Sequence, residues 1–255
     1  MSVSPEPGPL AGEAAPRVLL GMLTPSSNTV LEPVTAAMLA GLPEVSAHFG
    51  RFAVTEIALS ERALSQFDDT EILRAAELLA HARVGVIAWN GTSSGWLGFE
   101  ADHRLCRRIT AATGIPATTS MLALNEILER TGVRRLGLVT PYLDDVQARI
   151  VANYAQLGYA CAGERHLGRQ DNFSFSTIGA ASIAAMVREV AAARPDAIAA
   201  VCTNMRAAPL VAALERELDL PVYDTIATVL WKSLQLAGVD PARVKGWGRL
   251  FTLSG

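Results

Sequence analysis

The sequence predicts an α/β protein with two similar lobes, each a parallel sheet flanked by helices, and a cleft between them. Four short apolar runs, at residues 18–23, 84–88, 136–139 and 197–201, lack the polar/apolar alternation of half-exposed strands. Continuous runs of this kind are typical of parallel strands that helices cover on both faces. Amphipathic stretches separate the runs, and the alternation of strand and helix favours a doubly wound sheet.

A short internal repeat indicates that the chain has two related halves. Gly-Met-Leu-Thr-Pro at residues 21–25 recurs as Gly-Leu-Val-Thr-Pro at residues 137–141, each time at the end of the strand that opens a half. Because the phase of the strands also agrees, we expect two pseudo-symmetric lobes. The predicted organisation has three parts, namely a disordered tail (1–16), a first lobe (17–130 plus 228–255) and a second lobe (131–227).

The other elements follow in order from hydrophobic spacing. Shorter strands are expected at residues 47–54, 160–166 and 221–224. Helices are expected where apolar residues recur with helical spacing, at residues 70–82, 101–113, 121–131, 145–157, 180–193 and 207–217. After about residue 228 we expect the chain to cross back to the first lobe.

Composition narrows the class of protein. Half of the 255 residues are hydrophobic, 18% are charged and the net charge is −3, which favours a packed globular chain without a nucleic-acid partner. No apolar run reaches membrane-spanning length, so no membrane association is expected. The cysteines, Cys106, Cys161 and Cys202, are widely spaced and form no CxxC pair. We therefore expect neither a disulfide framework nor a metal site, and a reducing cytoplasm is the predicted location.

Polar residues gather directly after the four main strands, at residues 24–28, 89–94, 140–145 and 202–206. In an open parallel sheet, ligands bind outside the carboxyl ends of the strands. Each loop precedes a predicted or probable helix, whose free N–H groups favour a bound anion. Helix capping alone also explains any one such loop, but four of them together indicate a site for a small carboxylate. None matches a nucleotide-binding glycine motif.

Cys202 differs from the other cysteines because it stands at a strand end with a helix following it. In that setting the pKa of a thiol is expected to fall below its usual value of about 8.5. From spacing alone, packing in the core and chemistry remain equal alternatives for Cys202. Arg51 and Arg206 could meet a substrate carboxylate or lie in solvent. The scattered histidines form no Ser-His-Asp set with a nucleophile elbow.

At these loops the sequence resembles the Asp/Glu racemase superfamily, in its arylmalonate decarboxylase and maleate isomerase branch. The segment Pro25-Ser26-Ser27-Asn28 looks like the first-strand loop of maleate isomerases. The segments Gly91-Thr92-Ser93, Tyr142-Leu-Asp-Asp145 and Gly246-Trp-Gly-Arg-Leu-Phe251 look like arylmalonate decarboxylases, and Cys202 matches the cysteine of the second half. The likeness runs from about residue 18 over nearly all of the chain.

The resemblance implies a cofactor-independent enzyme with its active site in the cleft and no metal. Racemases and maleate isomerases of this branch place one cysteine in each half, whereas the decarboxylases keep the second and have glycine at the first position. The pair Gly91 and Cys202 is the decarboxylase pattern. Cys202 would then protonate an enediolate formed by loss of CO2 from a malonate-type acid. The groups implied to bind the carboxylate or its oxyanion are Thr92, Ser93, Tyr142, Gly91, Thr203, Asn204, Pro25, Ser26 and Asn28.

Departures from the decarboxylase pattern leave alternatives open. Small glycines follow the cysteine in those enzymes, but Thr203-Asn204-Met205-Arg206 follows it here, so a more polar pocket and an aliphatic or amino dicarboxylate are expected. The alternatives are a maleate-type cis–trans isomerase, an amino-acid or hydantoin racemase and a non-catalytic carboxylate-binding protein. Under the decarboxylase reading, Gly91→Cys is expected to add racemase activity. Assembly into a homo-oligomer is left open.

Overall fold

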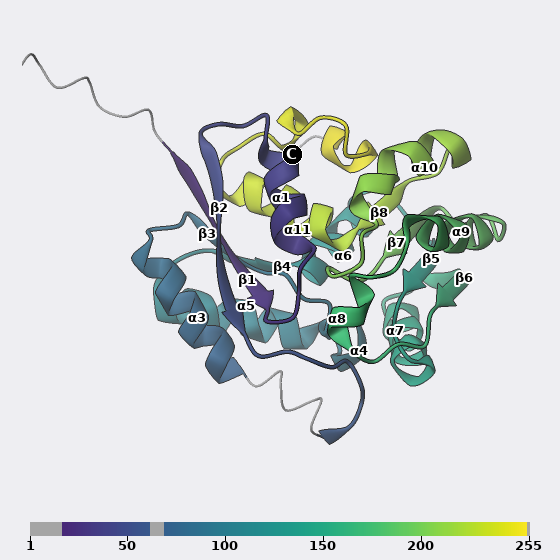
Figure 1. The fold of residues 1–255 in the computed structure, drawn as a ribbon, viewed down its shortest axis with the longest axis horizontal. Coiled ribbons are helices and arrows are strands. Elements are labelled where there is room, and N and C mark those ends of the chain that lie inside the picture. The colour runs from purple at the N-terminus through teal and green to yellow at the C-terminus, as the bar shows by residue number, and fades with distance from the viewer. Residues whose placement is uncertain (1–16, 62–68, 254–255) are drawn as a thin grey trace, which may run out of the picture.

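The computed structural model describes residues 17–61 and 69–253, which form two four-stranded parallel sheets with helices packed on them (Figure 1). The strand orders are β2-β1-β3-β4 and β6-β5-β7-β8, so the second sheet repeats the topology of the first. The predicted α/β class with two pseudo-symmetric lobes is confirmed. The predicted disordered tail, residues 1–16, lies outside the described residues.

The strands of the first sheet are β1 (Val18–Pro25), β2 (Val45–Phe52), β3 (Val86–Trp89) and β4 (Ala117–Thr119). Those of the second sheet are β5 (Arg135–Thr140), β6 (Ala160–His166), β7 (Ala197–Ala200) and β8 (Val222–Asp224). The described α-helices are α1 (Leu31–Leu39), α3 (Asp69–His81), α4 (Ser94–Leu97), α5 (Glu100–Thr113), α6 (Ser120–Arg130), α7 (Asp144–Gln156), α8 (Asn172–Phe175), α9 (Ala180–Ala191), α10 (Val211–Leu218) and α11 (Thr225–Leu236). Each predicted strand and helix has a counterpart, whereas β4, α1, α4, α8 and α11 were not among the predicted elements.

The glycines of the internal repeat lie at corresponding places in the two sheets. Gly21 is in β1 and Gly137 in β5, and each of these strands pairs with a neighbour on both sides. A Cβ atom at Gly21 would lie 2.9 Å from Cγ2 of Val84, and one at Gly137 would lie 2.5 Å from Cγ1 of Val190. At both positions neighbouring atoms leave no room for a Cβ, so a larger residue would force them to move.

Helix α11 joins the two lobes. It begins directly after β8, where the Asp224 carboxylate accepts hydrogen bonds from the N–H groups of Ile226 (2.8 Å) and Ala227 (3.2 Å) and so caps the helix. It then packs against α1, α6 and β3 of the first sheet's layer (Figure 1). The Thr228 hydroxyl donates to the Ser120 carbonyl on α6 at 3.0 Å. The chain after β8 thus contacts elements of the first sheet, and one cluster of buried hydrophobic residues includes side chains from both sheets.

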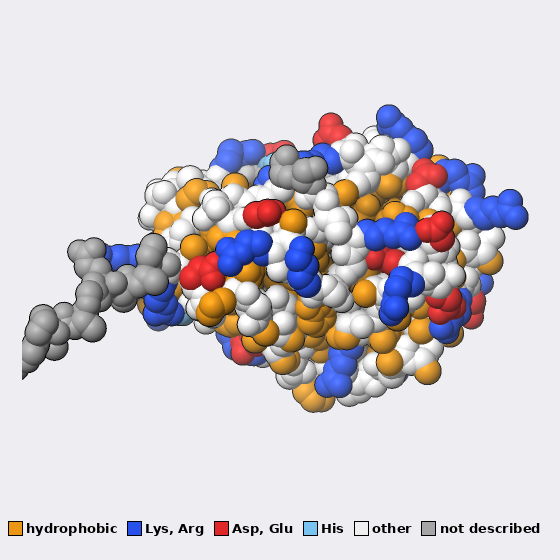
Figure 2. Space-filling model, turned by 90° about the horizontal axis from the view of Figure 1, so that it is seen from above, with side chains coloured by type: hydrophobic (Ala, Val, Ile, Leu, Met, Phe, Trp, Pro, Cys, Tyr) orange, Lys and Arg blue, Asp and Glu red, His pale blue; other side chains and the backbone are white. Residues whose placement is uncertain are grey.

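The face drawn in Figure 2 shows Lys and Arg side chains interspersed with Asp and Glu side chains, with no extended patch of one sign. Among the residues that the structure describes, no helix is long and apolar enough to cross a membrane.

Candidate active site

A small cavity lies where the strand-end loops of the two sheets meet. Pro25 ends β1 and Gly91 lies in the loop after β3, and the loops after β5 and β7 contribute Tyr142 and Cys202. The complete lining is Pro25, Val54, Ile57, Trp89, Gly91, Thr92, Trp96, Tyr142, Asn172, Cys202 and Thr203. The volume of the cavity is about 20 Å³, which is room for about one water molecule.

Cys202 follows β7 almost directly, and its side chain is buried with 3% exposure. Burial raises the pKa of the thiol to about 12, although the neighbouring N–H groups of Asn204 and Met205 and the Tyr142 hydroxyl act to lower it. The buried Asp224 carboxylate acts in the same direction as burial. The expectation of a lowered thiol pKa is therefore wrong, because desolvation outweighs the donors. At neutral pH Cys202 keeps its proton, as a general acid must.

Tyr142 links Cys202 to the first lobe. Its hydroxyl is hydrogen-bonded to the Cys202 sulfur and lies 2.7 Å from the Thr92 hydroxyl oxygen. The Tyr142 ring is held by edge contacts with Trp96 (centroids 5.3 Å apart) and Phe175 (5.6 Å). The pKa of Tyr142 is raised well above its usual value of 10.0, mainly by burial and to a smaller extent by the neighbouring Cys202. The phenol therefore stays protonated and serves as a hydrogen-bond donor.

Backbone donors lie beside these hydroxyl groups. The amide N–H groups of Gly91, Thr92 and Ser93 make no hydrogen bond within the part of the chain that the structure describes. Gly91 and Thr92 line the cavity, so their amides are available to a bound oxygen atom. Fixed donors in a desolvated pocket stabilise negative charge that develops on a carboxylate during a reaction. The site can therefore hold an oxyanion next to a protonated thiol.

The indole of Trp89 covers Gly91. A Cβ atom at Gly91 would lie 1.9 Å from Cζ2 and 2.2 Å from Cε2 of Trp89. Trp89 is the last residue of β3, is 1% exposed and packs on Phe52 with ring centroids 5.0 Å apart. The glycine is thus required by contact with the indole, and the space above it is filled rather than empty.

Amide side chains tie the two lobes together beside the cavity. The Asn28 side chain donates to the Thr203 hydroxyl (3.2 Å), and the Asn204 side chain donates to the Asn172 carbonyl (2.6 Å). The Asn172 side chain in turn donates to the Ser27 hydroxyl at 2.9 Å. We call these five residues the inter-lobe clasp. Because the clasp uses their polar atoms, Asn28 and Asn204 bind protein groups in this structure.

The other predicted site residues divide between the cavity and its surroundings. Pro25, Gly91, Thr92, Tyr142, Cys202 and Thr203 line the cavity, whereas Ser26, Asn28, Ser93 and Asn204 are not in its lining. The Ser26 hydroxyl bonds to the backbone of Val54, and Ser93 borders a neighbouring cavity. Arg51 pairs with Glu32 at 2.7 Å and donates to the Ser26 and Asn28 carbonyls. Arg206 is exposed and outside the cavity lining.

Sequence reasoning missed five residues of the lining, Val54, Ile57, Trp89, Trp96 and Asn172. Trp89 stands in the loop segment already noted, and its size next to a glycine was an unused signal. Val54, Ile57 and Asn172 come from segments that pair across the lobes, as shown by the hydrogen bond from the Asn172 N–H to the Thr55 carbonyl (3.0 Å). Nothing local in the sequence marks that pairing.

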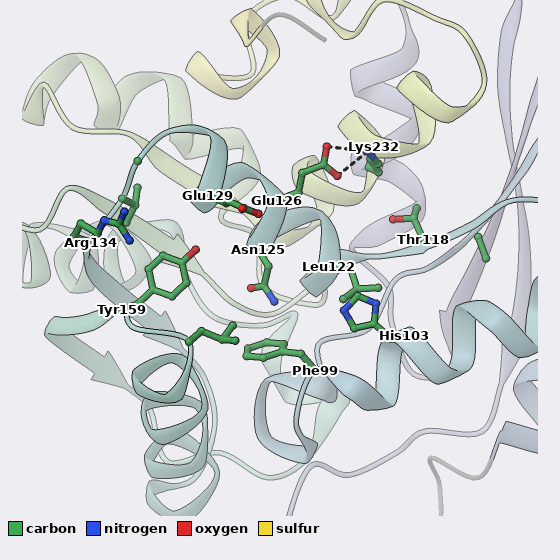
Figure 3. A pocket seen from close by; sticks show the side chains of 14 residues that line it. Phe99, His103, Thr118, Leu122, Asn125, Glu126, Glu129, Arg134, Tyr159 and Lys232 are labelled. Carbon is green, nitrogen blue, oxygen red and sulfur yellow. Dashed lines mark hydrogen bonds and ion pairs between the residues drawn. The ribbon is translucent and has the colours of Figure 1, made fainter.

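A second, larger cavity of about 680 Å³ lies among α5, α6, the loop before β5 and Lys232 of α11 (Figure 3). Its charged side chains include Glu126, which pairs with Lys232 at 2.6 Å, as well as Glu129 and Arg134. It shares no lining residue with the Cys202 cavity and contains no cysteine. Size alone therefore does not locate the chemistry. Among the described residues, no group of three or more His, Cys, Asp or Glu side chains is placed to hold a metal ion.

Comparison with known proteins agrees with the geometry. The sequence profile of the family described as arylmalonate decarboxylase matches residues 20–251. The chain belongs to this family. Arylmalonate decarboxylase from Bordetella bronchiseptica is 28% identical over 235 residues, which cover 91% of this chain and 95% of that protein. Maleate isomerase from Nocardia farcinica is 26% identical over 238 residues, covering 91% and 94%.

The solved structures that resemble this chain are of the same two kinds of enzyme, maleate isomerase and arylmalonate decarboxylase. A variant of the Nocardia farcinica maleate cis–trans isomerase with a covalently bound succinylcysteine intermediate superposes with a TM-score of 0.84 at 26% identity, covering 92% of this chain and 98% of that one. A liganded arylmalonate decarboxylase variant has a TM-score of 0.81 at 24% identity, with 92% and 98% coverage, and so supports the fold. The resemblance to the arylmalonate decarboxylase and maleate isomerase branch of the Asp/Glu racemase superfamily is confirmed.

Proposed function

We propose that this chain is a cofactor-independent decarboxylase of a malonate-type acid, with Cys202 as the general acid. The observation that supports this most directly is the buried, protonated thiol of Cys202 hydrogen-bonded to Tyr142. It faces a cavity that also holds the Thr92 hydroxyl and the unpaired amides of Gly91 and Thr92. A thiol that can give a proton therefore stands beside donors that can hold a carboxylate.

The proposed reaction has two steps. First, the bond between the substrate α-carbon and one carboxyl carbon breaks, CO2 leaves, and the electron pair forms an enediolate with the remaining carboxylate. The hydroxyls of Thr92 and Tyr142 and the adjacent amides hold its oxygens. Second, the Cys202 S–H bond breaks and its proton forms the new C–H bond on the α-carbon. The resulting thiolate regains a proton from water, which completes the cycle.

The apolar part of the lining favours loss of the carboxylate. Val54, Ile57 and Trp96 contribute side chains without charge to the cavity. A carboxylate placed against these side chains loses the hydration that stabilises its charge, whereas neutral CO2 has no charge to stabilise. The lining of the cavity thus combines residues that can hold one carboxylate with residues that disfavour another.

The alternative is a maleate-type cis–trans isomerase, which the TM-score of 0.84 with the Nocardia farcinica enzyme favours. Addition of a cysteine to a double bond needs the thiolate. Burial raises the pKa of Cys202 to about 12, so the thiolate is scarce at neutral pH. A two-base racemase needs a second proton-transfer group, and within the described lining Cys202 and Tyr142 are the only titratable residues. Decarboxylation fits the site better than either alternative.

The test compares the wild type with Cys202→Ala on methylmalonate, maleate and aspartate in D2O. We expect CO2 release from methylmalonate with one deuterium in the product, and a loss of about 10²–10⁴-fold in kcat for Cys202→Ala. Cys106→Ala is the matched control, because Cys106 lies in α5 outside the cavity, and it should retain wild-type turnover. Conversion of maleate without CO2 release would establish the isomerase alternative, and unchanged turnover in Cys202→Ala would refute both.

A cytoplasmic setting belongs to the same proposal. The mechanism requires Cys202 as a free thiol, and all three cysteines are free in this structure. A reducing compartment maintains that state.

A further inference from the structure

We propose that Trp89 determines the size of the substrate and restricts this site to malonic acids with a small aliphatic substituent. The inference rests on the proposed function and adds the substrate class. Its starting point is the contact between Trp89 and Gly91, two residues that line the same cavity as Cys202. The family's name refers to aryl substrates, and the geometry around Trp89 points to a different one.

The indole of Trp89 fills the space over Gly91, in the lining of the same cavity as Cys202. Ring atoms of Trp89 stand 1.9, 2.2 and 2.6 Å from the position of a Cβ on Gly91, so the ring lies directly on the glycine backbone. The remaining cavity measures about 20 Å³. An engineered cavity that binds benzene measures about 150 Å³. A cavity of about 20 Å³ has no room for any malonate, so a substrate enters only when the loops separate. The indole then still takes up volume that a phenyl substituent needs and a small aliphatic substituent does not.

Trp89 is held in that place from several directions. Its backbone is fixed by parallel pairing with Leu23 of β1 and Thr119 of β4. Its ring packs on Phe52 at 5.0 Å between centroids, with 44° between the ring planes, and is 1% exposed. A side chain with this support is a rigid wall of the pocket. Rigid apolar walls discriminate between substituents by size, at about 10–200-fold for each methylene group.

Two other aromatic residues of the lining, Trp96 and Tyr142, are also held in place. Trp96 and Tyr142 pack edge to face at 5.3 Å, and Tyr142 is fixed further by Phe175. Both residues line the cavity, so enlargement on that side would break the support of the Tyr142 hydroxyl. Removal of the Trp89 indole is the substitution that opens room for an aryl group without disturbing the donors.

The experiment measures kcat/KM for phenylmalonate and methylmalonate in the wild type, Trp89→Ala and Trp89→Phe. We expect the wild type to prefer methylmalonate, and the phenylmalonate/methylmalonate ratio to rise at least tenfold in Trp89→Ala. Trp89→Phe keeps an aromatic contact with Phe52 and should show a smaller rise, which covers the case in which Trp89→Ala does not fold. Trp247→Ala is the matched control, since Trp247 is partly buried outside the cavity and should leave the ratio unchanged.

A binding measurement separates this inference from the proposed function. Titration with phenylacetate and propionate reports the size of the pocket without turnover. If no variant releases CO2 but Trp89→Ala gains affinity for phenylacetate over propionate, the decarboxylase proposal fails and the role of Trp89 stands. If the wild type decarboxylates phenylmalonate faster than methylmalonate, or if both ratios stay unchanged in the folded Trp89 variants, the role of Trp89 is refuted.

Discussion

A methyl group added at Gly91 would lie inside the indole of Trp89, and this overlap gives a sharp prediction about stability. The added Cβ would stand 1.9 Å from Cζ2, whereas real Cβ contacts essentially never fall under 3.0 Å. The indole must therefore leave its place against Phe52. Overpacking of a core costs about 1–3 kcal/mol, and loss of a buried aromatic side chain costs about 3–5 kcal/mol. We expect Gly91→Ala to lower the free energy of unfolding by about 3 kcal/mol.

The double variant isolates the overlap from other effects of the substitution. Trp89→Ala alone should lower the free energy of unfolding by about 3–5 kcal/mol, as for other large-to-small core changes. In Trp89→Ala/Gly91→Ala the new methyl group enters the space that the indole has left, so the second change should cost almost nothing. The coupling between the two sites is then about 3 kcal/mol, at the upper end of values for residues in contact.

Equilibrium unfolding in urea, followed by circular dichroism, measures the free energy of unfolding of the four proteins in this double-mutant cycle: the wild type, the two single variants and the double variant. Gly41→Ala serves as the control, because a Cβ at Gly41 meets no atom within 4 Å and should change the free energy of unfolding by no more than about 1 kcal/mol. A Gly91→Ala variant as stable as the wild type, or additive effects in the double variant, would refute the reasoning.

The same overlap alters the expectation for Gly91→Cys. Its thiol has no room, so proton exchange in the product acid is expected only with Trp89→Ala.

Three further outcomes follow from the contacts around Cys202. Tyr142→Phe keeps the ring between Trp96 and Phe175 but removes a donor, so kcat for CO2 release should fall about 10²-fold with a native circular dichroism spectrum; unchanged kcat contradicts the proposed donor. Burial raises the pKa of Asp224 to about 7, so the folded state keeps a proton on this carboxyl at pH values where the unfolded state has lost it. The free energy of unfolding therefore falls as the pH rises towards 7. Asp224→Asn should remove a slope of up to about 1.4 kcal/mol per pH unit between about pH 5 and 6 in urea unfolding, and an unchanged slope contradicts the raised pKa of Asp224. Asn204→Ala breaks the inter-lobe clasp and should cost about 1–3 kcal/mol, with faster hydrogen exchange in residues 24–29 and 170–175; protection equal to wild type would rule out a clasp.

The architecture was predictable because its signals are local. Buried parallel strands appear as apolar runs, and the repeated Gly-x-x-Thr-Pro segment fixed the equivalence of β1 and β5. The missed elements have weaker local signals. Strand β4 is three residues long and contains two threonines, and α1 carries Pro33 in its first turn. Helix α11 is buried at nine of its twelve residues, and its polar residues include the buried Thr225, Thr228 and Ser233, so it lacks the clear polar face that marks a surface helix.

The candidate site was predictable only up to the convergence of the loops. Ligands bind at the carboxyl ends of parallel strands, and this rule predicts that Thr92, Tyr142 and Cys202 lie close together. All three line one cavity. The thiol pKa depends on desolvation by both lobes, which spacing does not report. The Asn28 side chain donates to the Thr203 hydroxyl, and the Asn204 amide oxygen accepts from the Thr29 N–H, in each case 175 positions away along the chain. These side chains therefore resembled ligand-binding groups, although in this structure they hold the loops together. Which way the Trp89 ring turns is likewise a tertiary property.

Burial of Cys202 has a consequence for the whole catalytic cycle. A cavity of about 20 Å³ leaves little water beside the thiol, so under the proposed mechanism the enediolate takes its proton from Cys202 and from one face. After the transfer, Cys202 is a thiolate in surroundings that raise its pKa to about 12, and such a base takes a proton from water readily. Under the same mechanism we expect water to reach the thiolate when the loops held by the inter-lobe clasp separate, and the same opening would release the product. Reprotonation of Cys202 and product release are therefore expected to occur in the same opening, and loosening the clasp should accelerate both together.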